Sequence, residues 1–135
     1  MDLLDSLKVS ASGLKAQATR LRTISENLAN ASSTATTPGG DPYRRKIATF
    51  RAVLDRVLGV TTVEPGKVAL DNSAFQTRYD PANPAADDKG YVKLPNVNSM
   101  IELADMREAE RSYDANLKVI EASRTMLQRA LDILR

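Results

Sequence analysis

Acidic side chains crowd one loop of this 135-residue chain and are its clearest candidates for metal chemistry. Asp80, Asn83, Asp87 and Asp88 bring together carboxylate and amide oxygens, the ligands that a hard cation prefers. Their order does not match a calcium-binding loop, and no glutamate closes the loop where such a site requires one. We therefore expect a solvated acidic turn here, without a metal ion.

Three glutamates further along, Glu102, Glu108 and Glu110, are the candidates for general acid and base chemistry. The sequence offers them no apolar pocket that would shift their pKa values, so we expect them on a solvated helix face. The chain contains no Cys and no His, which removes thiolate and imidazole metal ligands and the catalytic triads that use them. A glycine-rich phosphate-binding motif is also missing. We expect a protein that is not an enzyme and has neither a cofactor nor a small-molecule substrate.

A basic run at Arg44, Arg45 and Lys46 could contact phosphate groups or an acidic partner. The chain has 19 Lys and Arg against 17 Asp and Glu, so its net charge of +2 is not that of a strongly basic protein. We favour a charged strand edge that discourages pairing with other strands, and no nucleic-acid partner. The alternative is a nucleic-acid binder whose basic patch adds Arg51 and Arg56, which predicts salt-sensitive binding.

A helix is predicted over residues 2 to about 30. Leucines recur every seven residues, with small residues three positions earlier, as in the seam of a coiled coil. The rest of the helix carries mainly hydroxyl and amide side chains, and Gly13 costs about 1 kcal/mol of helix stability relative to Ala. We expect this helix to be marginal alone. Its seam should pack within or between subunits through Leu7, Leu14, Leu21 and Leu28.

A second helix is predicted over residues 99–135, which contain no Pro or Gly. Ser99 and Glu102 have the spacing of a capping box at its start. At 1.5 Å per residue this helix would be about 55 Å long, which favours a rod, a coiled coil or an assembly. Apolar residues cover a broad arc of its last turns. The packing partners of the N-terminal seam are expected at Leu117, Ile120, Leu127 and Leu131.

Residues 31–98 hold all six prolines and five of the six glycines, and separate the two helices. Short β-prone stretches alternate with turns in this segment. They lie at residues 44–54, whose end could instead be helical, and at residues 60–64, 75–79 and 91–94.

The predicted fold class is mainly α with a small β module. The long N- and C-terminal helices pair as a coiled-coil-like hairpin, and short strands and loops are inserted between them. We expect a helical domain of residues 1–30 plus 99–135 and a β/loop module of residues 31–98. A soluble coiled-coil adaptor or scaffold protein, folded as an oligomer in isolation, is one interpretation of these helices.

No stretch of the chain reaches the roughly 18–20 apolar residues of a membrane span. The N-terminus lacks a basic region followed by an apolar core, so no secretory signal peptide is predicted. We expect the chain to stay where it is made unless a pathway without a cleaved signal exports it.

Three motifs, in order along the chain, resemble the flagellar basal-body rod and hook axial protein family. The first is ISENLANA at residues 24–31, followed by a Ser/Thr-rich turn and DPYRRK. The second is YDPANPAADDKGYVKLPNVN at residues 79–98, and the third is SYDANLKVIEASRTMLQRAL at residues 112–131. The long insertion before the first aromatic residue is similar to that of the proximal-rod branch of the family. The family motif falls on Asn27, Leu28, Ala29, Asn30, Tyr43 and Arg44.

The resemblance implies a structural subunit of the bacterial flagellar proximal rod, a drive shaft that assembles helically and transmits torque. It implies export through the flagellar type III apparatus without a cleaved signal peptide, and a periplasmic place in the basal body. The implied partners are further copies of the chain, other proximal and distal rod proteins, the rod-base adaptor and the membrane ring. The terminal helices would line an inner tube beneath an outer layer of middle modules, and Asn27 and Asn30 would take helix-end and inter-subunit hydrogen bonds.

Overall fold

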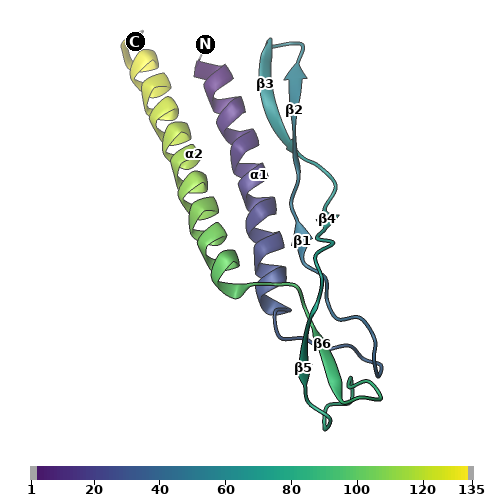
Figure 1. The fold of residues 1–135 in the computed structure, drawn as a ribbon. Coiled ribbons are helices and arrows are strands. Elements are labelled where there is room, and N and C mark those ends of the chain that lie inside the picture. Colours follow the sequence, from purple (N-terminus) through teal and green to yellow (C-terminus); the bar gives the residue numbers. More distant parts are fainter. Residues whose placement is uncertain (1–2, 134–135) are drawn as a thin grey trace. The chain divides into compact units, whose positions relative to one another are not determined.

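Two long helices begin and end the part of the chain that the structure, a computed structural model, describes: residues 3–133 (Figure 1). Helix α1 comprises Leu3–Ala29 and helix α2 comprises Ser99–Ile133. They confirm the predicted mainly α fold class with a small β part between the helices. Residues 2, 134 and 135 of the predicted helices lie outside the described residues. Within residues 3–133, neither helix combines the length and the apolarity that crossing a membrane requires.

The first turn of α2 is capped by Asn98. Its Oδ1 accepts hydrogen bonds from the backbone N–H groups of Met100 (3.0 Å) and Ile101 (3.4 Å). The prediction that Ser99 caps the helix is therefore wrong. The capping residue is Asn98, one position earlier, because its amide oxygen accepts from the N–H groups that a cap must satisfy. The Glu102 side chain makes its contacts elsewhere.

Six short strands of the described chain form three two-stranded antiparallel ladders. The pairs are β1 (Lys46–Ile47) with β4 (Ala69–Leu70), β2 (Phe50–Asp55) with β3 (Val60–Pro65), and β5 (Gln76–Tyr79) with β6 (Tyr91–Leu94). These strands confirm the predicted ones at residues 60–64, 75–79 and 91–94. The end of the stretch at residues 44–54 belongs to β2 and is extended rather than helical.

A tight turn closes the β2–β3 hairpin. The Asp55 carboxylate accepts hydrogen bonds from the N–H groups of Val57 (3.0 Å) and Leu58 (3.3 Å). Gly59 has φ 67°, a conformation that glycine adopts with little strain. The hydrogen bond from Lys8, followed by those of the two N–H groups, holds the pKa of the Asp55 carboxyl below its usual value.

The described chain divides into two compact units, and each helix contributes to both. The described residues of the first unit are 3–21, 48–67 and 107–133, which include most of α1, the β2–β3 hairpin and most of α2. The second unit comprises residues 22–47 and 68–106, which include the end of α1, the other two ladders and the start of α2.

In the first unit, α1 lies between α2 and the β2–β3 hairpin (Figure 1). A small residue allows the helices to approach closely, because a Cβ on Gly13 would lie only 2.8 Å from Nδ2 of Asn116. On the hairpin side, the Ser12 hydroxyl of α1 accepts a hydrogen bond from the Val63 N–H of β3 at 3.2 Å. Lys8 forms an ion pair with Asp55 on the same side.

In the second unit, the acidic loop of residues 80–88 is a hydrogen-bonded turn between β5 and β6. Oδ1 of Asp87 accepts from the N–H groups of Lys89 and Tyr91, both at 2.9 Å, and Oδ1 of Asn83 accepts from the Ala85 N–H at 3.0 Å. The hydrogen bond from Tyr91 is the largest cause that holds the pKa of Asp87 below its usual value. These acidic and amide oxygens order the loop.

Candidate functional site

Asn27, in the last turn of α1, is a buried junction between three segments of the second unit. Its Nδ2 donates to the Lys46 carbonyl at 2.9 Å and to Oε2 of Glu102 at 3.1 Å. Its Oδ1 accepts from the Tyr43 hydroxyl and from the Lys46 N–H, both at 2.9 Å. An Asn side chain offers two donors and an oxygen with two lone pairs. Contacts within the chain therefore use its full hydrogen-bonding capacity.

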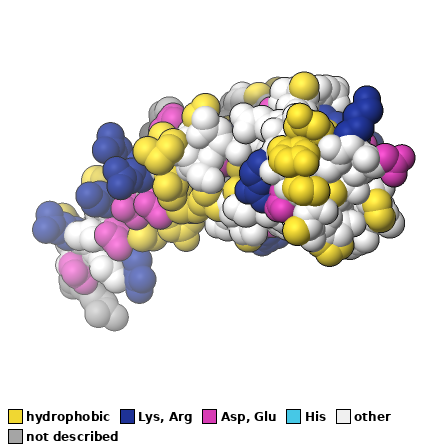
Figure 2. Space-filling view, turned by 60° about the horizontal axis from the view of Figure 1, so that its bottom comes forward, with side chains coloured by type: hydrophobic (Ala, Val, Ile, Leu, Met, Phe, Trp, Pro, Cys, Tyr) yellow, Lys and Arg dark blue, Asp and Glu magenta, His cyan; other side chains and the backbone are white. Residues whose placement is uncertain are grey.

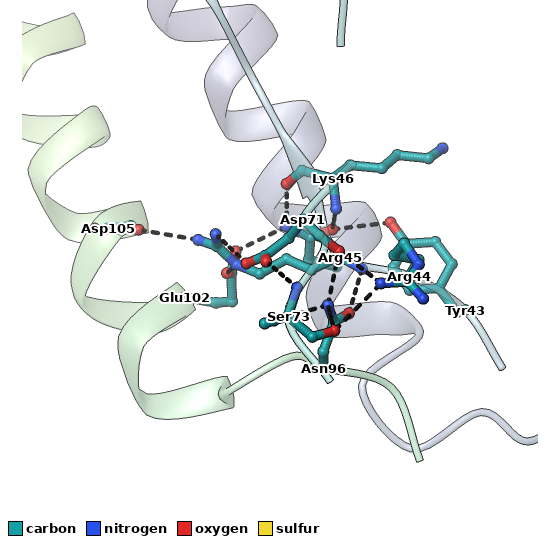
Figure 3. Close-up of polar contacts among 10 residues, drawn as sticks. Tyr43, Arg44, Arg45, Lys46, Asp71, Ser73, Asn96, Glu102 and Asp105 are labelled. Carbon is teal, nitrogen blue, oxygen red and sulfur yellow. Dashed lines mark hydrogen bonds and ion pairs between the residues drawn. The ribbon is translucent and has the colours of Figure 1, made fainter. Parts of the chain in front are cut away.

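Arg45 binds Glu102 beside this junction, as Figure 3 shows. The two side chains meet at 2.5 Å between Nε and Oε1, and Asp71 and Asp105 approach the guanidinium at 3.5 and 3.7 Å. Glu102 is fully buried, so the prediction of a solvated Glu102 is wrong. Arg45 supplies a positive charge and a hydrogen bond, and Asn27 supplies a second hydrogen bond. Without such partners, burying a carboxylate is very costly. Glu108 and Glu110 are exposed, as predicted.

Burial lowers the pKa of Arg45, but the hydrogen bond and charge of Glu102 outweigh burial and raise the pKa above its usual value. Burial also raises the pKa of the Tyr43 phenol, which keeps the phenol protonated and able to donate to Asn27. Both effects favour the protonation states that the junction requires.

The other two cations of the basic run also have partners within the second unit. Arg44 donates to the Asp71 carbonyl at 2.9 Å, and its guanidinium lies 4.2 Å from the centre of the Phe75 ring. Lys46 forms an ion pair with Glu26 at 2.8 Å, and this hydrogen bond is the main cause that raises the pKa of Lys46. Since intrachain partners already engage each cation of the run, the structure weighs against a phosphate-binding patch here.

Asn96, in the segment between β6 and α2, connects the junction to the segment between β4 and β5. Its Oδ1 accepts from the Arg45 N–H at 2.7 Å, and its Nδ2 donates to the Asp71 carbonyl at 2.9 Å (Figure 3). A hollow of about 190 Å³ lies here, lined by Arg45, Asp71, Asn96, Asn98, Ile101 and Glu102. Residues 3–133 contain no group of three or more His, Cys, Asp or Glu side chains that could hold a metal ion. Asn27, Arg45, Asn96 and Glu102 thus connect chain segments through hydrogen bonds and an ion pair, and we call this cluster the polar clamp.

The residues of the family motif surround this clamp. Asn30 donates from Nδ2 to the Glu26 carbonyl at 2.8 Å, at the end of α1. Leu28 is half-buried and Ala29 is exposed. The structure thus brings Asn27, Tyr43 and Arg44 into one hydrogen-bonded region, while their role between subunits stays a prediction.

The eight residues predicted to pack are only partly covered within the chain. All four leucines of the α1 seam are half-buried, as are Ile120 and Leu127 of α2. Leu117 and Leu131 are exposed, the latter by 64%. The most buried positions of α1 are instead small or polar, and the leucines lie at the margin of that buried face. These positions are Ser10, Ala16, Thr23, Ile24 and Asn27.

Helix α2 exposes apolar residues on both sides of its buried face in the first unit. That face is marked by Ala109, Asn116 and Ser123, which recur every seven residues. At about 100° per residue, two apolar strips flank this face. The first strip is Val119, Met126 and Ile133. The second strip contains Leu117 and Leu131, with the exposed Arg124 between them.

Large hydrophobic side chains are exposed in both units of the described chain. Val57, Ile133 and Met100 are exposed by 91%, 84% and 77%. Hydrophobic side chains stand among charged ones on the face drawn in Figure 2. The described residues thus leave much apolar surface for a partner to cover.

Two models of flagellar protein families match segments of this chain. Residues 88–133 match the family model of the flagellar basal body rod FlgEFG protein C-terminal region, and residues 7–35 match that of the flagella basal body rod proteins. The chain is 56% identical over 128 residues to the flagellar basal-body rod protein FlgC of Agrobacterium fabrum, covering 95% of this chain and 92% of the relative. It is 40% identical over 153 residues to FlgC of Borreliella burgdorferi, covering 100% and 99%, and 37% identical over 148 residues to FlgC of Bacillus subtilis, covering 98% and 99%.

The chain therefore belongs to the FlgC family of flagellar basal-body rod proteins, and it is a structural subunit of the proximal rod.

Two residues of the junction were not predicted from the sequence: the buried Glu102, and Asn96, which connects two chain segments. One signal was available for Glu102, because it stands seven residues before Ala109 in the series that marks the buried side of α2. The sequence holds no comparable signal for Asn96.

Proposed function

We propose that this subunit assembles helically with further copies of itself and with other rod proteins, and that the assembled rod transmits torque. The observation that carries the proposal is the exposed apolar surface of α2, on both sides of the face that the chain buries itself. A helix with two uncovered apolar strips can contact two neighbours, as a subunit in a lattice of heterologous contacts must. Long helices held side by side would give the rod its stiffness.

The packing residues of this assembly are the α1 seam, at Leu7, Leu14, Leu21 and Leu28, and Leu117, Ile120, Leu127 and Leu131 of α2. The half-buried state of the seam supports this assignment, because each leucine keeps apolar surface that another helix could cover. We assign residues 1–30 and 99–135 to the inner tube and residues 31–98 to the outer layer.

The subunit reaches the periplasm through the flagellar type III apparatus, without a cleaved signal peptide, and joins the proximal and distal rod proteins, the rod-base adaptor and the membrane ring. Its hydroxyl-rich, glycine-containing α1 would remain poorly ordered during export. Ordering of α1 would then be coupled to burial against neighbours.

Three aspartate variants test the proposal in a motile host that lacks the native gene. Leu131→Asp places a charge on the second strip, where the chain leaves the side chain 64% exposed, so the variant should fold but fail to enter basal bodies. Leu21→Asp and Leu127→Asp should fail likewise. The matched control is Thr125→Asp, which adds the same charge to the polar side of α2. The readouts are the subunit content of isolated basal bodies and swimming in soft agar.

Normal rods and swimming with Leu131→Asp would contradict the proposal. A stable helical oligomer formed by the purified wild-type chain, together with normal assembly of the variant, would favour the soluble coiled-coil adaptor instead.

A further inference from the structure

The outer edge of β2 can be identified from its pairing with β3. Phe50 is paired with Pro65, which has no N–H to donate across the ladder. Ala52 is paired with Val63, whose N–H points to α1 and donates to the Ser12 hydroxyl at 3.2 Å. Both pairs are therefore of the kind that exchanges no hydrogen bonds.

Bonded and non-bonded pairs alternate along an antiparallel ladder. The next pair beyond Phe50 agrees with this alternation, because the Gly66 N–H donates to the Thr49 carbonyl at 2.7 Å. The backbone N–H and C=O groups of Phe50, Ala52 and Leu54 thus point away from β3. No hydrogen bond to these groups occurs within residues 3–133.

This edge is longer than those of the β1–β4 and β5–β6 ladders. Strands β1 and β4 are two residues long, and β5 and β6 are four residues long. Strand β3 faces α1 along its outer side. Strand β2 is six residues long, FRAVLD, and contains no Pro, Lys or Gly. A long uncovered edge of this kind is a template for another strand.

An apolar surface adjoins the same edge. Phe50 and Leu54 are 40% and 59% exposed, and Val63 is exposed on the face that it shares with them. On the opposite face, Arg51 is paired with Glu64 at 2.8 Å, and Asp55 is paired with Lys8. The charges of β2 are thus already neutralised, so an added strand would be selected by apolar side chains at every second position.

We propose that the outer edge of β2 accepts, by strand addition, an extended segment of a neighbouring rod subunit other than its β2, with apolar side chains at alternate positions. This inference rests on the proposed assembly, because the rod supplies the neighbour. The segment would take its main-chain hydrogen bonds from Phe50, Ala52 and Leu54 and would cover the apolar side chains beside them.

Hydrogen exchange measured by mass spectrometry tests the pairing directly. The Phe50, Ala52 and Leu54 amides should exchange readily in the free subunit and about tenfold or more slowly in isolated basal bodies. Equal rates in the two samples would overturn the strand addition while leaving the assembly intact. Absence of the subunit from basal bodies would overturn the proposed assembly, and this inference with it.

A proline variant tests the role of the central donor. Ala52→Pro removes an N–H that the β2–β3 ladder does not use, so the hairpin should still form, as protected exchange at Val53 would verify. The variant should reduce subunit incorporation into basal bodies at least about tenfold, while the control Ala52→Val, which keeps the donor, should assemble normally. Normal incorporation of the proline variant, or equal loss with the valine control, would overturn the inference. So would a wild-type dimer that the proline variant converts to monomer, because the edge would then pair with a second copy of β2.

Discussion

Asn27, Arg45 and Glu102 show how single side chains join segments that are far apart in the chain. Burying a carboxylate and an amide is costly unless each polar atom finds a partner. Glu102 finds a cation in Arg45 and a donor in Asn27, and Asn27 uses its remaining groups on β1 and Tyr43. These contacts hold the end of α1, the basic run and the start of α2 together.

Glu102→Gln should destabilise the second unit. The substitution keeps the shape of the side chain but leaves Arg45 without its closest counter-charge. Breaking one partner of a buried ion pair costs about 3 kcal/mol of the free energy of unfolding. Urea unfolding followed by tyrosine fluorescence reports on this, because three of the four tyrosines, Tyr43, Tyr79 and Tyr91, lie in the second unit.

Glu108→Gln is the matched control for that measurement. The Glu108 side chain is 71% exposed and meets Arg20 at 3.5 Å, so its ion pair should contribute less than about 1 kcal/mol. Equal effects of the two substitutions would show that the Glu102 contacts do not stabilise the protein.

Asp87 should make the second unit sensitive to acid. Its pKa is lowered, first by the hydrogen bond from Tyr91, so its contribution to stability is complete above the usual value of 3.8 and is lost as pH falls below it. Asp87→Asn removes the charge and keeps an acceptor oxygen. The urea midpoints of wild type and variant should therefore differ at pH 6 and converge as the pH falls below 3.8. An equal pH-dependent difference for the neighbouring Asp88→Asn control would contradict this assignment.

Among the elements, small residues and not the leucine heptad set the approach of α1 to α2. Gly13 faces Asn116, and Ala16 and Ala109 are buried in the same unit. A glycine inside a helix costs stability. At position 13 the space that a Cβ would need is filled by the Asn116 side chain, which donates to the Ser112 carbonyl at 3.0 Å.

A double-mutant cycle of Gly13→Ala and Asn116→Ala should show a coupling free energy between these two positions. Alanine at position 13 gains helix propensity but forces Asn116 to move, and Asn116→Ala removes that conflict. We expect the second substitution to stabilise the Gly13→Ala protein by about 1 kcal/mol more than it stabilises the wild type. Thermal unfolding of the four proteins by circular dichroism gives the cycle, and additive effects would mean that the two side chains do not meet.

For the whole molecule, the exposed hydrophobic side chains determine how the chain behaves before assembly. A chain that leaves large hydrophobic side chains exposed has buried less apolar surface to offset the entropy of ordering. The uncovered strips of α2 and the half-buried leucines of α1 are where that burial is missing. Partners in the rod would complete it.

The purified subunit should therefore be a monomer with less helix than the 27 residues of α1 and 35 of α2 would give. Circular dichroism and sedimentation over a range of concentrations measure both properties. Helix content should rise when the subunit is part of isolated basal bodies, as exchange protection of α1 amides would show. A fully helical dimer at micromolar concentration would mean that the seams are already satisfied without rod partners.

The sequence by itself determined the elements, because their signals are local. Heptad leucines predicted the first helix, and the absence of Pro and Gly supported the second. The β-branched residues before Pro65 predicted β3. The three motifs that resemble the rod and hook family predicted its class. The acidic loop was correctly predicted to be a turn, because Asp and Asn accept hydrogen bonds from nearby backbone groups.

Tertiary structure alone decided what each helix face meets. Periodicity shows which residues share a face, but the partner of that face comes from distant segments. Glu102 turned inward because Arg45 and Asn27 lie beside it, and the leucines of α1 lie at the margin of the buried face because Gly13 and Ala16 allow closer approach. The free edge of β2 likewise depends on how β3 packs on Ser12, a contact between residues 51 positions apart.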